Sequence, residues 1–432
     1  MAEMKDSGIH AIGRIPKEWN VVRTKYLSNI SIGLVTTMTE NYVEKEEGVP
    51  LIRNGNIRCN KIDVNGMVFL DKRFAEKNKH RQLHTGQIAT VHTGDVGTSI
   101  VIPEEYDGGL GFATIQSTPY KGVSSEFLCW FYNSAAFKNQ CIECSTGDGR
   151  QNLNLYDFVD LFVAIPKYDL QSKIASFLDK KCAEIDSLHT DIEKQIEILE
   201  EYKKSIITEA VTKGLNSAVE MKESGIEWIG KIPKSWMTSP LKYNYYLITG
   251  ATPDSSNSEL WDGDIQWITP ADFKTRDIYV FEGSRKLTVL GYNSCSTTIV
   301  PAGSIIFSKR APIGSVVICK EKICTNQGCI SLVAKNSTVN NKYYYYVLSI
   351  YNDVFNLMGS GTTFKEISTT IFGNVMLPYP DKSAQNEIAD FLDSKCLEID
   401  FVIKEKKEQL ETLEQYKKSL IYEYVTGKKE VK

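Results

Sequence analysis

The sequence predicts an α+β chain with a pseudo-two-fold internal repeat, in which two globular domains of mixed helix and strand are separated by two long antiparallel coiled-coil helices. Two observations lead to this prediction. Residues 8–19 return as residues 225–236 with the same glycines, proline and final tryptophan, so the 432-residue chain contains a duplicated unit of about 215 residues. Two further segments carry apolar residues at every seventh position, the pattern of a coiled coil, which Lys406 interrupts in the second segment.

The repeat continues through the chain but is interrupted by divergent segments. Residues 86–97 match 303–314, and the later segment 174–186 matches 388–400, whereas the stretches 54–85 and 271–302 share almost no residues. We therefore expect a duplicated unit whose matching segments surround two different inserts. This divides the chain into domains at 1–168 and 217–380 and into spacer helices at 169–216 and 381–432.

The heptad segments predict two long helices that need a partner. Helices of roughly 40 residues would be about 60 Å long, and each has an apolar face to cover. We expect the two helices to pair antiparallel with each other; the alternative is that each packs only on its own domain. The heptad residues are Leu178, Ile185, Ile192, Leu199 and Ile206 in the first helix, and Leu392, Ile399, Leu413 and Leu420 in the second.

The globular segments have the composition of mixed α and β domains. Short β-branched runs, such as 87–91 in the first domain and 304–307 in the second, are bounded by Gly, Pro and Asp and predict strands. Aromatic-rich runs at 127–132 and 343–348 predict helix cores. Each domain ends in an apolar strand that leads to a proline, and a long helix is expected just beyond it.

Composition excludes several classes of protein. A hydrophobic content of 42% with 24% charged residues is typical of a folded globular chain. The sequence has no apolar run of about 18 residues and no secretory leader, so we expect a cytoplasmic protein without a membrane partner. Ten cysteines without a spacing framework predict reduced thiols. The net charge of −4 limits any polyanion-binding surface to a local patch.

Motifs for catalysis are missing from the sequence. There is no phosphate-binding loop of the Walker type, no dinucleotide-binding glycine turn between strand and helix, and no nucleophile elbow. No metal cluster of His and Cys is present, and the five histidines are too widely spread to suggest a catalytic triad. The chain is therefore predicted to bind rather than to catalyse.

The variable segments hold polar and basic side chains that suit nucleic acid. Arg, Asn and Gln side chains can form two hydrogen bonds at once with the edge of a base, and Lys and Thr side chains suit contact with phosphate. Solvent-exposed loops of any protein are polar as well. The candidate DNA contacts are Arg53, Asn54, Asn56, Arg58, Lys72, Arg73, Lys77, Lys79, Arg81, His92, Thr93, Arg150 and Gln151 in the first domain, and Thr269, Asp272, Lys274, Arg276, Lys286, Ser308, Lys309, Arg310, Gln327, Thr362, Thr363 and Lys365 in the second.

These features together resemble the DNA specificity subunits of type I restriction-modification enzymes. The resemblance covers essentially the whole chain. It is carried by the tandem layout, by the two openings with Ile-Pro-Lys and a tryptophan, and by the helix start Gln-x-x-Ile-Ala-x-Phe-Leu-Asp, which occurs at Gln171 and at Gln385. The Gly-Thr-Thr-Phe-Lys stretch of the family is clear at 361–365, whereas the first half has Gly-Arg-Gln-Asn at 149–152.

The resemblance implies a division of labour. Each globular domain would be a target-recognition domain that reads one half of a split, asymmetric sequence in double-stranded DNA, and the helices would be the spacer between the halves. Two methyltransferase subunits would dock on the frame and methylate adenine with S-adenosylmethionine, and ATP-dependent restriction subunits would join them. S-adenosylmethionine, ATP and Mg are then expected in the partner subunits, and this chain would bind no cofactor and carry no catalytic residue.

Two other hypotheses remain open at this point. A coiled-coil scaffold that binds only proteins would have the same helices, and its polar loops would contact protein instead of DNA. A nuclease or methylase with an unrecognised site would act on DNA by itself. DNA binding that depends on salt in the presence of a methyltransferase distinguishes a DNA specificity subunit from a protein-only scaffold.

Overall fold

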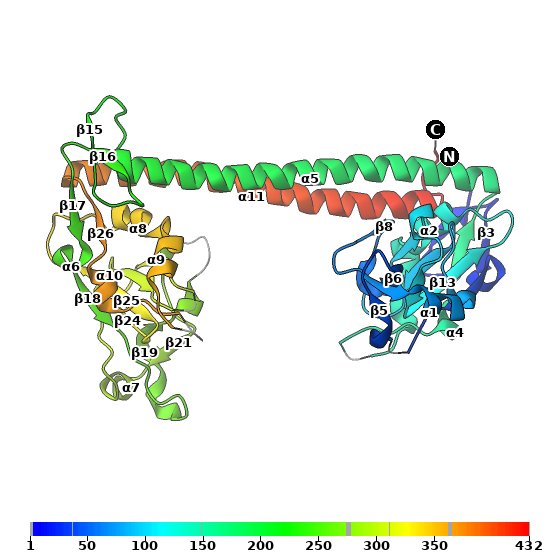
Figure 1. The fold of residues 1–432 in the computed structure, drawn as a ribbon, viewed down its shortest axis with the longest axis horizontal. Helices are drawn as coiled ribbons and strands as arrows, with labels where there is room; N and C mark the ends of the chain where they lie inside the picture. The colour runs from blue at the N-terminus through cyan, green and yellow to red at the C-terminus, as the bar shows by residue number, and fades with distance from the viewer. Residues whose placement is uncertain are drawn as a thin grey trace. The chain divides into compact units, whose positions relative to one another are not determined.

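The computed structural model describes residues 3–36, 38–147, 149–273, 278–310, 312–361 and 365–431. The chain forms two compact units, Met1–Glu193 with Lys407–Lys432, and Lys194–Lys406. Each unit contains one globular domain and parts of the two long helices, α5 (Tyr168–Lys213) and α11 (Lys382–Val425) (Figure 1). The units therefore divide each long helix, whereas the expected boundaries gave each helix a segment of its own, 169–216 and 381–432.

The first domain contains two four-stranded sheets. One sheet is antiparallel with the order β11-β10-β13-β4, and the other has the order β12-β6-β9-β5 with a parallel pair between β12 and β6. The strands are β4 (Ser28–Ile32), β5 (Tyr42–Val43), β6 (Gly48–Arg53), β9 (Val68–Asp71), β10 (Ile88–Val91), β11 (Ser99–Val101), β12 (Leu110–Phe112) and β13 (Thr114–Pro119).

Short helices complete the core of the first domain. Burial of the apolar side of α2 places Phe127 and Tyr132 in the core, where the ring of Tyr132 stacks on Phe137 with 4.3 Å between centroids. The helices are α1 (Lys72–Lys77), α2 (Ser125–Tyr132), α3 (Ala135–Cys144) and α4 (Leu155–Phe158), with 3-10 turns η1 (Thr24–Tyr26), η2 (Thr39–Asn41), η3 (Asn54–Asn56), η4 (Lys79–Arg81) and η5 (Glu104–Tyr106).

The second domain repeats this topology. Its sheets have the orders β18-β25-β22-β23-β20 and β21-β19-β24, so the strands of the first domain have counterparts in the same order, with β20 added and no counterpart of β5 among the described residues. The strands are β18 (Tyr245–Thr249), β19 (Trp261–Ile268), β20 (Tyr279–Val280), β21 (Arg285–Leu287), β22 (Ile305–Ser308), β23 (Val316–Cys319), β24 (Ile323–Thr325) and β25 (Cys329–Ala334).

The strand pairs at the start and end of each domain are also duplicated. Hairpins β1–β2 and β15–β16 open the two halves, and β3–β14 and β17–β26 pair the start of each domain with its end. The bounds are β1 (Met4–Asp6), β2 (Arg14–Pro16), β3 (Asn20–Arg23), β14 (Phe162–Ile165), β15 (Met221–Glu223), β16 (Lys231–Pro233), β17 (Met237–Pro240) and β26 (Met376–Tyr379), with helices α6 (Leu241–Asn244), α7 (Val289–Asn293), α8 (Asn341–Ser349), α9 (Asn352–Met358) and α10 (Thr369–Gly373), turns η6 (Ser258–Leu260) and η7 (Pro270–Asp272), and the hairpin of β7 (Ile57–Arg58) with β8 (Lys61–Ile62).

The duplicated opening stretch packs on the end of a long helix in each unit. Gly427 follows α11 with a φ of 68°, and a Cβ built there would lie 2.6 Å from Pro16 and 2.9 Å from the ring of Trp19. In the second unit Gly214 follows α5 with a φ of 75°, and a Cβ built on Gly214 would lie 3.2 Å from the ring of Trp236. Glycine ends each helix because it adopts positive φ without a steric penalty and lets the tryptophan approach the backbone.

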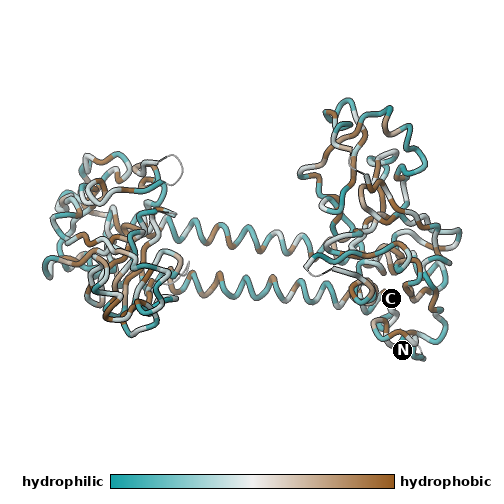
Figure 2. Tube along the Cα trace, turned by 90° about the horizontal axis from the view of Figure 1, so that it is seen from below, coloured by the Kyte–Doolittle hydropathy of each residue, from teal (hydrophilic) through white to brown (hydrophobic). Residues whose placement is uncertain are grey.

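The long helices pair antiparallel within each unit. In the first unit the rings of Phe177 and Tyr424 lie 4.4 Å apart, and Lys417 pairs with Asp186. In the second, Lys203 Nζ lies 2.6 Å from Asp400. Figure 2 shows hydrophobic positions recurring along otherwise hydrophilic helices. Antiparallel pairing, predicted from the heptads, is confirmed.

The buried stripe departs from a strict heptad near the end of α5. Leu178, Ile185 and Ile192 are buried as predicted, but further along Ile207 is buried and Ile206 is only half-buried. A straight helix with 3.6 residues per turn drifts about 20° per heptad, so the buried side moves by one position over several turns.

Among the described residues, no helix is both long and apolar enough to span a bilayer.

Asp186 links both long helices to the first domain, and its loss is expected to destabilise the first unit. Its carboxylate accepts hydrogen bonds from Lys417 of α11 and, at 2.6 Å, from Lys61 of the β7–β8 hairpin. Burial alone would raise the pKa of Asp186, but the hydrogen bonds and charges of the two lysines lower it on balance. Asp186→Asn should cost about 1–3 kcal/mol at pH 7, measured by urea unfolding.

The pH dependence of that cost follows from the lowered pKa. The carboxylate stabilises the folded chain above its ordinary pKa of about 4, and this contribution is lost as the pH falls through the lower folded-state value. The difference between wild type and Asp186→Asn should therefore shrink in acid. Asp400→Asn, which removes an acceptor from Lys203 alone, is the matched control with a smaller cost. An equal cost at pH 7 and in acid would contradict the assignment.

Candidate nucleic-acid interface

A loop near the end of the first domain pairs with the end of strand β10. Leu153 N donates to His92 O at 2.9 Å, Gly94 N donates to Gln151 O at 2.9 Å, and Thr93 and Asn152 form an antiparallel bridge. We call His92, Thr93, Gln151 and Asn152 the first strand-end site. Candidate residues from two distant segments are thus brought together.

Side chains of the first strand-end site form a hydrogen-bonded chain. His92 Nδ1 lies 2.8 Å from Thr93 Oγ1, and the Thr93 hydroxyl donates to Asn152 Oδ1 at 3.0 Å. Asn54 joins the site, because its Oδ1 accepts a hydrogen bond from His92 N at 3.3 Å. Burial lowers the pKa of His92, so its imidazole is neutral at pH 7.

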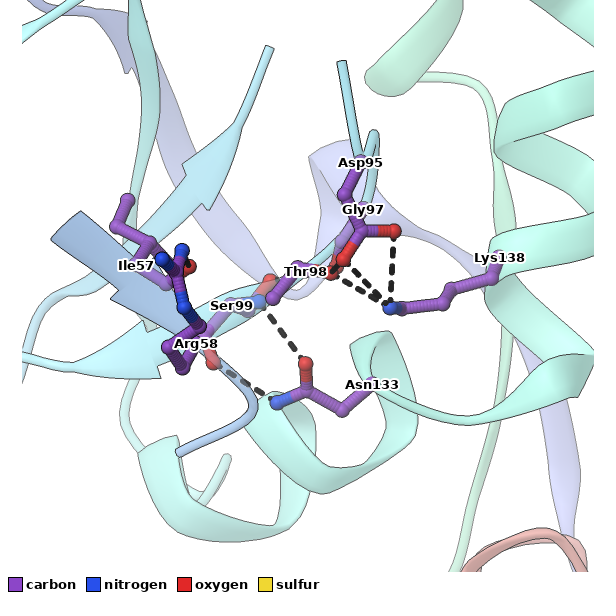
Figure 3. Close-up of polar contacts among 8 residues, drawn as sticks. All are labelled: Ile57, Arg58, Asp95, Gly97, Thr98, Ser99, Asn133 and Lys138. Atoms are coloured by element: carbon purple, nitrogen blue, oxygen red, sulfur yellow. Dashed lines mark hydrogen bonds and ion pairs between the residues drawn. The ribbon is translucent and has the colours of Figure 1, made fainter. Parts of the chain in front are cut away.

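The loop that follows His92 and Thr93 is held from behind by α2 and α3. Lys138 Nζ lies 3.3 Å from Asp95 Oδ1 and donates to Thr98 Oγ1 (Figure 3). Asn133 accepts from Ser99 N at 2.9 Å and donates to Ser99 O at 2.8 Å. These bonds fix the start and end of the turn between β10 and β11, so the strand-end site is preorganised.

The second domain has the same arrangement with different side chains. Ile367 N donates to Lys309 O at 3.0 Å, and Arg310 and Glu366 form the bridge. Lys309 Nζ lies 2.7 Å from Glu366 Oε1, whereas Arg310 Nη1 lies 3.9 Å from Glu366 Oε2. We call Lys309, Arg310, Lys365 and Glu366 the second strand-end site. Its side chains are charged, whereas the hydrogen-bonded side chains of the first strand-end site are neutral.

Glycines with positive φ shape the loop in each site. Gly147 has a φ of 121°, and a Cβ there would lie 2.4 Å from Arg150 O, so no other residue fits this turn. Gly361 has a φ of 123° in the second site. Arg150 and Lys365 are exposed and Gln151 is half-buried. The tight turn explains the glycines and presents the basic side chains at the surface.

Capping interactions occupy some of the predicted contact residues. Asn56 is 1% exposed, accepts from Arg53 N at 3.1 Å and donates to Asp63 O at 2.9 Å. Asp272 accepts from Thr269 N at 2.7 Å, from Thr269 Oγ1 at 2.8 Å and from Ser284 N at 2.8 Å. Because these groups satisfy backbone donors of η3 and η7, Asn56 and Asp272 have structural roles in the fold.

Other predicted residues divide between surface and interior. Ser308 is fully buried and donates to Pro312 O, and Arg81 donates to Gly33 O at 2.8 Å, so both serve the fold as well. The remaining candidates keep exposed or half-buried side chains. These are Lys72, Arg73, Lys77 and Lys79 on α1 and η4, Arg53, which donates to Gly66 O, Arg58, which is 3.0 Å from Asp63, and Thr269, Lys286 and Gln327 in the second domain.

Some candidates lie outside the described residues, and some functional candidates were not predicted. Lys274, Arg276, Thr362 and Thr363 fall in the segments that the structure does not describe. Asn152 and Glu366 were missed, although each follows a predicted residue directly. Asn152 corresponds to Glu366, and His92 to Lys309, when the two halves of the repeat are aligned with a three-residue gap between these positions, and this correspondence is a sequence signal that could have found them.

No group of three or more His, Cys, Asp or Glu side chains in the described part of the chain could hold a metal ion. All ten cysteines are free thiols, and Cys182 and Cys396 are buried at equivalent positions in the two helices, where they fill the core as small residues.

Comparisons with known proteins agree with this architecture. A model of the type I restriction modification DNA specificity domain matches residues 16–198 and 233–412. The MjaIX specificity subunit of Methanocaldococcus jannaschii is 36% identical over 197 residues, which is 45% of this chain and 44% of that protein. The putative MjaX specificity subunit of the same organism is 26% identical over 432 residues, covering 98% and 96%.

Solved structures show the same fold. A chain from a study of complex assembly and conformational transition of the type I R-M system superposes with a TM-score of 0.73 at 16% identity, covering 95% of this chain and 98% of that one. The HsdS subunit of Thermoanaerobacter tengcongensis gives 0.55 at 15% identity, covering 96% and 98%. Since the family model matches both halves of the repeat, the chain belongs to the family of type I restriction-modification DNA specificity subunits.

Proposed function

We propose that the chain is the subunit that selects a bipartite, asymmetric DNA sequence for a type I restriction-modification complex, with one half-site read by each domain. The observation that carries this proposal is the pair of strand-end sites. Their backbone hydrogen bonds are equivalent, but His92, Thr93 and Asn152 in one correspond to Lys309, Arg310 and Glu366 in the other. Two sites with the same backbone arrangement but different polar side chains suit the recognition of two different half-sites.

Exposed basic groups on α1 and η4 of the first domain support contact with the DNA backbone. Lys72, Arg73 and Lys77 lie on α1, whose N-terminus is capped by Asp71 and whose buried side includes Ala75. Lys79 forms a long ion pair, 3.8 Å, with Glu76. Phosphate contacts of this kind give affinity and register without sequence information, so they complement the strand-end residues.

Equivalent exposed apolar residues support the docking of two copies of one methyltransferase subunit. In the first unit Leu188 and Tyr416 are 48% and 53% exposed. Their counterparts in the second unit, Val402 and Tyr202, are 38% and 55% exposed. Two like surfaces suit two like partners. The methyltransferase subunits would supply S-adenosylmethionine chemistry, restriction subunits would supply ATP-dependent cleavage, and the long helices would set the spacing of the half-sites.

A domain exchange tests this function directly. Residues 20–165 are replaced by the equivalent segment of another family member, and the chain is expressed with its methyltransferase and restriction subunits. Because the first strand-end site lies inside this segment, only one half of the methylated motif should change, as read by methylome sequencing. Exchange of residues 237–379 is the matched control and should change only the other half. A change in both halves, or in neither, would contradict the proposal.

The same complex distinguishes the other two hypotheses. Its affinity for the methylated motif should fall steeply as salt rises, because phosphate contacts release counterions. A protein-only scaffold would leave the DNA affinity of the methyltransferase unchanged. Cleavage or methylation of DNA by the purified chain alone would instead indicate a catalyst with an unrecognised site.

A further inference from the structure

We propose that the two strand-end sites read opposite hydrogen-bonding patterns: His92 accepts a hydrogen bond from a base that presents an amine, adenine or cytosine, and Arg310 donates to guanine. This inference rests on the proposed function and adds the chemistry of one position in each half-site. It is carried by the hydrogen-bond chain of the first site. In the second site it is carried by the unequal distances of Glu366 from Lys309, 2.7 Å, and from Arg310, 3.9 Å.

The chain of bonds in the first site fixes which nitrogen of His92 carries the hydrogen. A threonine hydroxyl has one hydrogen, and Thr93 gives it to Asn152 Oδ1 at 3.0 Å. Thr93 Oγ1 can therefore only accept from His92, so the hydrogen of the neutral ring sits on Nδ1, at 2.8 Å. The other nitrogen, Nε2, is then a bare acceptor, and it has no hydrogen-bond partner among the residues described.

An acceptor at this place selects a class of base. In the major groove adenine presents its N6 amine and cytosine its N4 amine, whereas guanine and thymine present carbonyl oxygens that would repel an acceptor. His92 is half-buried, and the contact of its Nδ1 with Thr93 Oγ1 at 2.8 Å orients the ring. The first half-site should then require adenine or cytosine at one position.

The second site has the opposite polarity. Lys309 is only 12% exposed at its side chain and holds Glu366 at 2.7 Å. Arg310 is 35% exposed, and at 3.9 Å its guanidinium lies beyond hydrogen-bond distance of the same carboxylate. A guanidinium has donors and no acceptor, and guanine O6 and N7 are the acceptors that it matches in pairs. Arg310 is therefore the residue of this site that reads guanine.

Selection from DNA pools randomised in each half-site, with the chain bound to its methyltransferase subunits, tests the inference. His92→Leu should reduce the preference for adenine or cytosine at one position of the first half-site by about 5- to 150-fold, with the second half-site unchanged. Arg310→Met should have the mirror effect on guanine in the second. Circular dichroism of both complexes verifies folding.

Two further variants address the role of the chain of bonds. Asn152→Asp keeps an acceptor for Thr93 and should retain the base preference, while Thr93→Val frees the His92 ring to exchange its hydrogen and should weaken the preference without abolishing binding. The inference is overturned if variants that still bind DNA show unchanged preferences at every position. A wild-type complex without sequence-selective binding would instead overturn the proposed function.

Discussion

Insertion of one heptad into both long helices, after Glu193 in α5 and after Lys406 in α11, is expected to increase the spacing between the half-sites by about three base pairs while leaving both half-sequences unchanged. Seven helical residues add about 10 Å, and a base pair rises 3.4 Å. The insertion points are the boundaries of the two compact units, so the packing inside each unit is kept.

The register of the helix pairs explains why both insertions are needed. Asp186 pairs with Lys417 in the first unit and Lys203 with Asp400 in the second, so a step of 17 residues along α5 (186 to 203) is matched by a step of 17 residues back along α11 (417 to 400). An insertion in α5 alone breaks this match, and one set of pairs must slip or the helix must bulge. Paired insertions preserve it.

Methylome sequencing of cells that carry each variant measures the outcome. The double insertion should give the original half-sites at a longer spacing, and the single insertion in α5 should abolish methylation or lower it severely. An insertion of three residues in both helices is a control that turns the apolar face about 60° away from the partner helix and should also fail. Methylation by the double variant at the original spacing would refute the spacer role.

Gly427→Ala is expected to destabilise the first unit by about 2–5 kcal/mol. Its φ of 68° costs a side-chain-bearing residue about 1–2 kcal/mol. The added methyl would also lie 2.6 Å from Pro16 and 2.9 Å from Trp19, and overpacking of this kind costs about 1–3 kcal/mol. Since Pro16 and Trp19 belong to the duplicated opening stretch, the variant loosens the contact that the repeat preserves.

Gly8→Ala is the matched control, because Gly8 has a φ of 76° with no atom within 4 Å of the added carbon. It should cost only the backbone term, about 1–2 kcal/mol. Calorimetry of both variants gives the difference, and hydrogen exchange of residues 10–20 and 420–431 localises it. Equal costs for the two variants would show that the contact with Pro16 and Trp19 has no energetic weight.

Most of the fold could be predicted from the sequence because its signals are local. The β-branched runs became β10 and β22, the aromatic runs became α2 and α8, and the heptads became α5 and α11. The departures also have local causes, since Ile207 replaces Ile206 in the buried stripe through helical drift. The divergent inserts could not be assigned in this way, yet β9 and β21 lie beside β6 and β19 in the same positions.

The candidate site was only partly predictable, because its residues meet through long-range pairing. Thr93 and Asn152 are 59 positions apart, and nothing in the local sequence shows that they touch. Polarity by itself also failed to separate surface from interior: Ser308 and Asn56 are polar but buried, and their groups satisfy backbone partners.

The sequence by itself determined the duplication, the periods of its helices and strands and the family to which they point, since each is written in residues close together or repeated at a fixed distance. Only the tertiary structure decided which polar side chains face outward and what each can donate or accept. The physical reason is that hydrogen-bond partners are allocated across strands and loops after they pair. Thus Thr93 and Asn152 set the free nitrogen of His92, and Glu366 holds Lys309 while leaving Arg310 available.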